Sequence, residues 1–433
     1  MEKVFRLREH GTTFQQEVIA GLTTFLTMAY ILAVNPGMLG SIGDGMTREA
    51  VFTATVVSSA IATLVMAFAA NLPIVLAPGM GLNAFFTYTV VSSMGYSWRI
   101  ALTAVFLEGI LFIILSLFKI REAIINAIPA NLKKAVAVGI GLFITLIGFA
   151  NAGIVVNSGG TIIGLGDITT GHPLMALLGF VIIVVLYSLR IPGSILIGIL
   201  LTTIIGIPFG ITQIPQNWSP VDFPAAPLFF AFDFSPGALL NFKFFTVFFT
   251  FLFVDVFDTV GTLVGVTQQA GLLSKDGKIP KVKEALLADA IGTVAGAALG
   301  TSTVTSYVES AAGVAAGGRT GLTSLATGLL FLVALFFSPV FLLVPSAATA
   351  PALIMVGYFM IKPVVGIDFK DPTEGIPAFL AIIMMPFAYS IAEGIVYGVI
   401  SYVILKLAAG KLKEISVVTW ILFAIFVLRF FMK

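Results

Sequence analysis

The sequence contains no cysteine, and only 10% of its 433 residues carry a charge. The absence of cysteine excludes disulfides, thiolate metal sites and cysteine nucleophiles. The scarcity of charge excludes an ordinary soluble domain, in which about 25% of residues are charged. The net charge of +2 gives no indication of binding to nucleic acid.

Motifs of soluble enzymes are missing as well. The chain has no Walker loop, no HExxH sequence and no C-x-x-C sequence, and its two histidines, His10 and His172, lie outside the long apolar runs. We therefore expect no catalytic residues, no metal site and no cofactor. A membrane-embedded enzyme would lack any obvious set of metal ligands or nucleophiles.

Apolar residues are abundant instead. They make up 58% of the chain, and the mean hydropathy is +1.08. Because about 20 apolar residues cross the roughly 30 Å of hydrocarbon in a bilayer, this length predicts an all-α polytopic membrane protein with about a dozen to fourteen spans. The polar start, MEKVFRLREHGTTFQQE, precedes an apolar run long enough to span, so we expect the first span to be retained.

The apolar runs form two groups of seven. The first group covers 17–35, 49–70, 76–92, 98–118, 131–152, 173–189 and 192–210. The second covers 242–267, 284–299, 303–316, 322–345, 346–362, 375–389 and 392–408. A further apolar stretch, 416–431, is either an interfacial helix or an extra span.

Lysine and arginine gather on one side of this topology, with Arg99 as an exception. The side includes Lys3, Arg6, Arg8, Lys119, Arg121, Lys133, Lys134, Arg190, Lys275, Lys278, Lys281 and Lys283. The two longest loops on the other side, 153–172 and 211–241, contain neither residue type. Because positively charged short loops stay in the cytoplasm, we expect a cytoplasmic N-terminus in the cell membrane.

Two segments differ from continuous apolar spans. They are LAPGMGLNAFFTYTV at 76–90 and GTSTVTSYVESAAGVAAGGRTG at 300–321, each in third place within its group of seven. Irregular backbone is tolerated at membrane depth only where protein or a water-filled cavity satisfies it, and paired interruptions indicate the substrate site of a transporter. We therefore predict two inverted repeats of seven spans, with the third and tenth broken. Tight helix contacts between small residues are the alternative.

Carboxylates inside the predicted spans are few, and each costs on the order of 3 kcal/mol on insertion scales. Glu108 and Glu393 fit ties between helices, and Asp289 fits a cap or a snorkelling side chain. The remaining three are candidates for a ligand site: Asp255, Asp258 and Glu309.

Asp255 and Asp258 are three residues apart and are expected to share a helix face with Thr262. Two close carboxylates cannot both ionise comfortably in a low dielectric, so one could carry a proton. Glu309 lies in the middle of the second broken segment, where a carboxylate can accept hydrogen bonds from ring N–H or amine donors. A buried structural carboxylate with its own partners is the alternative at each position.

Asn83 in the first broken segment can both donate and accept hydrogen bonds. It stands beside Phe85 and Phe86, and this combination suits a flat heteroaromatic ligand. The alternative is a helix cap.

Four strings in the chain resemble a known family. GLTTFLTMAYILAVNP, APGMGLNAFF, FVDVFDTVGTLVGV and TSYVESAAGVAAGGRTGLTS closely resemble the AzgA-like purine permease branch of the nucleobase/cation symporter-2 (nucleobase-ascorbate transporter) family, over essentially the whole chain. The resemblance implies fourteen spans in two inverted repeats. It also implies a core domain made of 1–118 and 242–345, and a gate domain made of 119–241 and 346–433.

The resemblance further implies a function and the residues that carry it. Family members import hypoxanthine, guanine or adenine with protons, by elevator-like movement of core against gate. Substrate contacts would come from Asp258, Glu309, Asn83, Phe85, Tyr307 and Thr27. Proton coupling would come from Asp258, Asp255 and Glu309.

The expected partners are a purine nucleobase, protons and membrane lipid, with a homodimer suggested by the family alone and no nucleic acid. An anion transporter or channel on the same architecture is the alternative function. Such a protein would favour cationic groups near half-helix N-termini. The predicted spans contain almost no basic residues and several carboxylates, which favours a ligand with N–H donors.

Overall fold

A computed structural model describes residues 2–117, 129–158, 161–273 and 279–431. Nine helices within these ranges are long and apolar enough to cross a membrane. Three further helices, α10 (Ser194–Gly206), α13 (Val282–Leu299) and α18 (Pro372–Phe387), and the two broken segments bring the total to the fourteen predicted spans. The prediction of an all-α polytopic membrane protein is therefore confirmed. Lys119, Arg121, Lys275 and Lys278, used above for orientation, lie outside the described residues.

The first half of the chain follows the predicted runs closely. Its elements are α1 (Glu2–Phe5), α2 (Phe14–Met28), α3 (Ile31–Leu39), α4 (Arg48–Val65), β1 (Leu76–Pro78), α5 (Met80–Ala84), α6 (Trp98–Leu117), α8 (Ala130–Asn151), β2 (Val155–Ser158), β3 (Thr161–Leu165), α9 (Gly171–Ser188) and α10 (Ser194–Gly206). Two π-helical segments, Met66–Ala70 and Phe85–Ser93, extend α4 and α5.

The second half repeats this pattern. Its elements are α11 (Pro236–Leu239), α12 (Phe242–Gln269), α13 (Val282–Leu299), β4 (Val304–Ser306), α14 (Ser310–Ala315), α15 (Gly321–Ala334), α16 (Ser338–Leu342), α17 (Ser346–Met360), α18 (Pro372–Phe387), α19 (Ile391–Ala408) and α20 (Val417–Phe431).

Several helices begin at the polar residue that the sequence places before an apolar run. Thr13, Thr47 and Asn241 each accept a hydrogen bond from a backbone N–H in the first turn, of α2, α4 and α12 respectively. Such caps satisfy donors that would otherwise lack a partner at a helix start. The polar breaks in the sequence thus fix where these spans begin.

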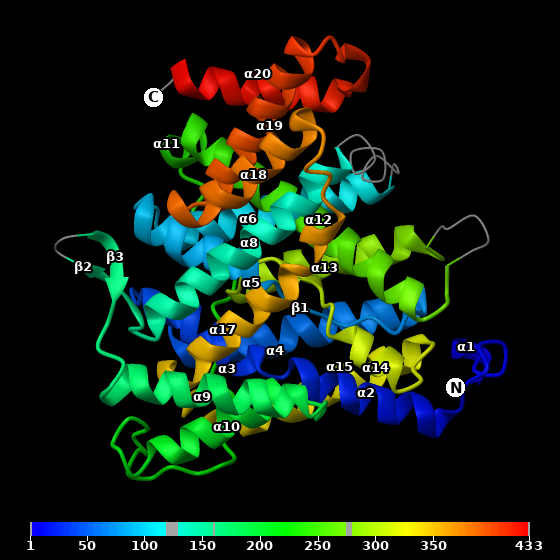
Figure 1. The fold of residues 1–433 in the computed structure, drawn as a ribbon. Coiled ribbons are helices and arrows are strands. Elements are labelled where there is room, and N and C mark those ends of the chain that lie inside the picture. Colours follow the sequence, from blue (N-terminus) through cyan, green and yellow to red (C-terminus); the bar gives the residue numbers. More distant parts are fainter. Residues whose placement is uncertain (1, 118–128, 159–160, 274–278, 432–433) are drawn as a thin grey trace.

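The two broken segments meet at the centre of the molecule. Strands β1 and β4 pair antiparallel, with Leu76 opposite Ser306 and Pro78 opposite Val304, and all residues of both strands are buried. Figure 1 shows β1 surrounded by helices. The predicted interruptions in the third and tenth spans are therefore confirmed.

Neighbouring groups satisfy the backbone around these strands. The Gly79 N–H donates to the Thr303 carbonyl at 2.9 Å, and the Tyr307 N–H donates to the Val75 carbonyl at 2.9 Å. The Thr63 hydroxyl accepts from the Leu76 N–H at 3.1 Å. Because lipid offers no hydrogen bonds, strands at this depth depend on such enclosure by protein.

The first span is also interrupted. Helix α2 ends at Met28 and α3 begins at Ile31, so Ala29 and Tyr30 form a turn inside the span. Tyr30 is only 1% exposed. The span predicted at 17–35 lies within the apolar stretch Phe14–Ile42, and no glycine or proline in the sequence marks the turn inside it.

The helices pack in two groups. One contains α2, α4, α6, α12, α13, α14 and α15, and the other contains α8, α9, α10, α17, α18 and α19. The hairpin β2–β3 and the N-terminal helix α1 lie at opposite ends of the molecule (Figure 1). Helix α20 packs against α19 and places Phe426 against Phe249 of α12, with ring centroids 5.9 Å apart.

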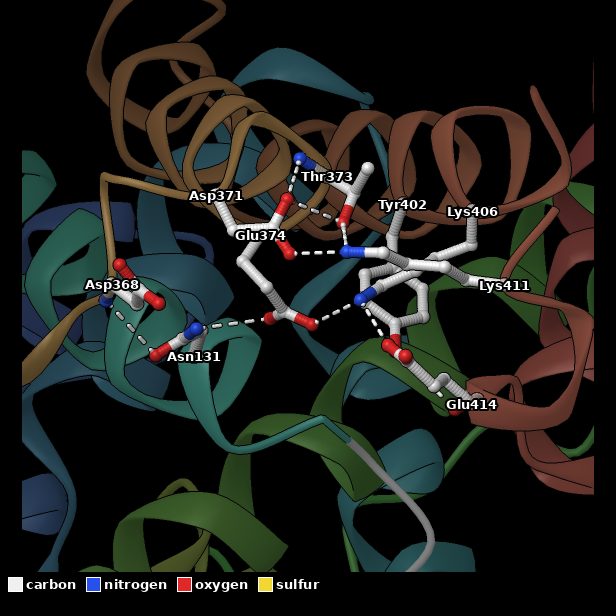
Figure 2. Close-up of polar contacts among 9 residues, drawn as sticks. All are labelled: Asn131, Asp368, Asp371, Thr373, Glu374, Tyr402, Lys406, Lys411 and Glu414. Carbon is white, nitrogen blue, oxygen red and sulfur yellow. Dashed lines mark hydrogen bonds and ion pairs between the residues drawn. The ribbon is translucent and has the colours of Figure 1, made fainter. Parts of the chain in front are cut away.

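A polar cluster fastens one end of the second group (Figure 2). At its centre is Lys406 of α19, whose side chain is 1% exposed. Its Nζ lies 2.7 Å from Glu374 Oε1 on α18 and 2.5 Å from Glu414 Oε2 beyond α19. Glu374 Oε2 also accepts from Asn131 Nδ2 of α8 at 2.9 Å. One lysine therefore joins three helices and the segment that leads to α20.

A second pair extends this cluster at the surface. Lys411 Nζ lies 2.6 Å from Asp371 Oδ2, the residue that caps α18. The Lys411 ammonium and the Thr373 N–H hold the pKa of the Asp371 carboxyl well below its usual range. This pair is about one-third exposed, so water and salt weaken its contribution.

We expect Lys406 to stabilise the folded protein more than Lys411 does. Lys406→Met leaves two carboxylates without their shared buried cation, which costs on the order of 3 kcal/mol. Lys411→Met breaks the exposed pair, which contributes little because water and salt screen it. Thermal unfolding of the purified protein in detergent should show a drop of several degrees for Lys406→Met and little change for Lys411→Met. Equal shifts in the two variants would contradict a central role for Lys406.

Candidate functional site

A pocket of about 260 Å³ opens between the two helix groups, next to the paired strands. On the side of the first group it is lined by Tyr30, Gly79, Met80, Asp258, Gly261, Thr262, Tyr307 and Glu309. On the side of the second group it is lined by Val136, Ile140, Val356, Phe359 and Met360. Most of this wall is apolar, with two carboxylates set into one side. A mostly apolar cavity with a few placed polar groups is typical of small-molecule sites.

Asp258 reaches the pocket from α12. The Thr305 hydroxyl of β4 donates to Asp258 Oδ2 at 3.1 Å. Gly261 and Thr262 line the pocket on the same side of α12, because residues three and four apart are neighbours on a helix surface. Of the face predicted to hold Asp255, Asp258 and Thr262, only Asp258 and Thr262 line the pocket.

Glu309 reaches the pocket from the residue before α14. The Tyr30 hydroxyl, at the break between α2 and α3, donates to Glu309 Oε1 at 2.6 Å. Glu309 and Asp258 line the same pocket. Two carboxylates from elements far apart in the sequence thus face one small space.

Tyr307 also lines the pocket, and it is 5% exposed. Its hydroxyl donates to the Pro78 carbonyl at 2.6 Å, so the residue spans from one broken segment to the other. Its ring is the part available to a ligand, because the hydroxyl is already engaged.

Three of the predicted substrate contacts do not line the pocket. Asn83 is fully buried, and its Nδ2 donates to the Pro78 carbonyl at 3.3 Å. Phe85 is also fully buried and packs edge-on against Phe251, with ring centroids 4.9 Å apart. Thr27 lines a separate, wider cavity of about 970 Å³ between α2, α9 and α17. These residues support or flank the pocket in this conformation instead of contacting its contents.

Asp255 belongs to a different cluster, behind the pocket. It is fully buried, and the Thr259 hydroxyl lies 3.2 Å from Asp255 Oδ1 and 2.5 Å from Asp289 Oδ1 on α13. Three residues of helix turn through about 300°, which leaves an offset of about 60° between Asp255 and Asp258. The two aspartates therefore have different neighbours, although they are close along α12.

Two contributors were missed by the sequence analysis. Tyr30 gave no signal, because a tyrosine within an apolar run is ordinary and its partner Glu309 lies 279 positions away. Thr305 could have been found, because it is a polar residue inside the second broken segment.

The two sides of the interface between the helix groups are built from different contacts. The pocket lining includes Met360 and Pro363, which flank Lys362 at the end of α17. At the other end of α8, the Asn151 Nδ2 donates to the Tyr88 hydroxyl at 2.8 Å. The Tyr389 ring packs edge-on against Tyr88 and against Phe143, with centroids 6.5 and 5.4 Å apart. The contacts of Tyr88 with Asn151 and Tyr389 join the π-helical segment after α5 to the second helix group on that side.

A family model described as "Permease family" (Xan_ur_permease) matches residues 15–397. The guanine/hypoxanthine permease PbuG of Bacillus subtilis is 46% identical over 437 residues, which cover 99% of this chain and 99% of that protein. The adenine permease AdeP of Escherichia coli is 43% identical over 429 residues, which cover 99% of this chain and 95% of that protein. Both relatives are permeases, which are transporters and not enzymes.

Solved structures with much lower identity share the fold. The transmembrane domain of the cyanobacterial bicarbonate transporter BicA matches with a TM-score of 0.65 at 17% identity, over 89% of this chain and 97% of that chain. The murine Solute Carrier 26 family member A9 anion transporter, in its inward-facing state, matches with a TM-score of 0.62 at 12% identity, over 91% of this chain and 68% of that chain. At such low sequence identity, these matches show a shared fold and nothing more. The sequence relatives and the matched model together show that this multi-pass membrane protein belongs to the nucleobase/cation symporter-2 family of permeases.

Proposed function

We propose that this protein imports purine nucleobases, namely hypoxanthine, guanine or adenine, by proton symport across the cytoplasmic membrane. The observation that carries the proposal is the convergence of Asp258 and Glu309 on one pocket beside the paired strands. The names of the relatives, an adenine permease and a guanine/hypoxanthine permease, support the substrate class. The N-terminus would lie in the cytoplasm. The homodimer implied by the family resemblance stays a prediction.

The chemistry of the pocket suits a neutral heterocycle. Carboxylate oxygens accept hydrogen bonds from ring and exocyclic N–H groups, and purines carry such donors on their edges. The apolar walls, including Ile140 and Phe359, would cover the faces of a flat ring. An anion would instead meet two carboxylates, which disfavours the anion-transporter alternative in spite of the shared fold.

Protonation would lower the energy needed to move the substrate-loaded site through the membrane barrier. A bare carboxylate is costly to carry through a low-dielectric barrier. A proton taken up by Asp258 or Glu309 would remove part of that charge. Asp255 would take part through Thr259, the residue that follows Asp258. The Thr259 hydroxyl donates a hydrogen bond to Asp255 Oδ1.

Transport would follow from movement of the first helix group, as a core, against the second, as a gate. The core would comprise 1–118 and 242–345, and the gate 119–241 and 346–433. Two observations support this elevator-like movement. The pocket lies between the groups and includes residues beside Lys362, and the Tyr88, Asn151 and Tyr389 contacts close the other side. With the N-terminus in the cytoplasm, as proposed, this arrangement would be a cytoplasm-facing conformation.

The first prediction concerns substrate uptake. In Asp258→Asn and Glu309→Gln, the loss of a charge-assisted hydrogen bond, about 2–3 kcal/mol, should lower uptake of labelled hypoxanthine by at least about 30-fold. Glu393→Gln is the matched control, because this carboxylate lies in α19 and does not line the pocket. Undiminished purine uptake by both correctly inserted pocket variants would rule out the site. Uptake of anions without any uptake of purines would favour the alternative function.

The second prediction concerns the coupling ion. In reconstituted vesicles, an inward proton gradient should accelerate hypoxanthine uptake, because protonation neutralises the moving site. A protonophore should abolish this acceleration, and an inward sodium gradient at equal pH should not replace it. Uptake that follows sodium alone would refute proton symport.

The third prediction concerns movement and uses the absence of cysteine in the chain. A Tyr88→Cys, Asn151→Cys pair places two thiols across the closed side of the interface, without background from other cysteines. Because the native contact is made through the tip of the Tyr88 side chain, a bifunctional thiol reagent that contains a reducible disulfide would bridge the two cysteines. If the two groups must separate there, this cross-link should stop uptake, and reduction should restore it. Tyr88→Cys alone serves as the control for loss of the native contact. Normal uptake by the fully cross-linked protein would exclude movement at this contact.

A further inference from the structure

We propose that Tyr30 fixes how Glu309 presents its carboxylate, and thereby which purine edge the pocket prefers. The inference rests on the proposed function. It concerns a positioning residue in the first span, which the sequence analysis did not identify.

The hydrogen bond between these residues is short and enclosed. The Tyr30 hydroxyl lies 2.6 Å from Glu309 Oε1, and Tyr30 is 1% exposed. A hydrogen bond to an ionised acceptor is among the stronger ones in proteins. One of the two Glu309 oxygens is thus engaged by the protein before any ligand arrives.

The element that carries Glu309 is held against the first span at two further points. A Cβ on Gly313 of α14 would lie 2.0 Å from the Thr24 hydroxyl and 2.7 Å from the Ala20 carbonyl, so α14 and α2 are in close contact. Farther along, the Glu17 carboxylate of α2 accepts from the Arg319 N–H at 2.8 Å and from the Thr323 hydroxyl at 2.6 Å. The first span therefore supports the whole stretch that follows β4.

This support gives Tyr30 little freedom to move away. Its ring belongs to the buried core, and its backbone forms the turn between α2 and α3. Glu309 can therefore offer a ligand mainly its other oxygen, Oε2. Asp258 is restricted in the same way, because Thr305 donates to its Oδ2.

A carboxylate with one available oxygen favours a base edge with a single N–H. Hypoxanthine presents one N–H on its six-membered ring. Guanine presents the same N–H beside an exocyclic amino group. These two donors could form two parallel hydrogen bonds, one to each oxygen of a carboxylate, as in other bidentate pairs. Engagement of Oε1 by Tyr30 therefore selects against the second hydrogen bond that guanine could form.

The test is Tyr30→Phe, which keeps the ring and removes only the hydroxyl. Hypoxanthine and guanine would each compete against labelled hypoxanthine in the reconstituted full-length protein. Without the Tyr30 hydroxyl, the Glu309 carboxylate loses its fixed orientation, so hypoxanthine should bind several-fold more weakly. Guanine binding should weaken less, because Oε1 becomes available to it. The ratio of their inhibition constants should shift toward guanine by about fivefold or more. Because both competitors are measured on one sample, the ratio does not depend on how much protein folds.

Tyr307→Phe is the matched control. It removes a hydroxyl from the same pocket, but that hydroxyl bonds to the Pro78 carbonyl and not to Glu309. Its effect on the two competitors should be equal. If Tyr30→Phe also changes both equally, Tyr30 has a structural role only and the inference is overturned. If the unaltered protein takes up no purine, the proposed function itself fails, which is a separate outcome.

Discussion

The structure depends on one constraint, that no backbone polar group can be left without a partner inside a membrane. The pairing of β1 with β4 meets this constraint for two segments that leave the helical path. The short pairing brings the start of α5 and the residues before α14 to the same depth. Once these ends meet, Asp258 and Glu309 can face a common space, and the rest of the first helix group serves to hold that arrangement in place.

Much of the architecture was predictable because composition and polar breaks determine it. Long apolar runs specify spans, and small residues in the third and tenth runs specified the interruptions. Asp258 and Glu309 were identified because carboxylates are conspicuous in such runs, whereas Tyr307 was suggested only by the family resemblance. These signals depend on residue type and spacing, which the sequence contains directly.

Other features depend on how a helix is rotated about its axis and on contacts between residues far apart in the chain. The spacing of residues in the sequence does not reveal either. Asn83 and Phe85 lie in the expected segment, but the path from β1 into α5 turns them away from the pocket. Tyr30 became important through a partner 279 positions away. The partners of Lys406, likewise, come from α18 and from the segment after α19. None of these pairings has a local signature in the chain.

The contact between Glu17 and the start of α15 has a consequence for how the chain is made. The carboxylate in the first span accepts hydrogen bonds from residues about three hundred positions later, at Arg319 and Thr323. At ordinary rates of synthesis, roughly 15–60 s separate the two. During that interval the earliest helix enters the bilayer with an acidic side chain still waiting for its permanent neighbours. The first span can therefore reach its final contacts only after synthesis has passed Thr323.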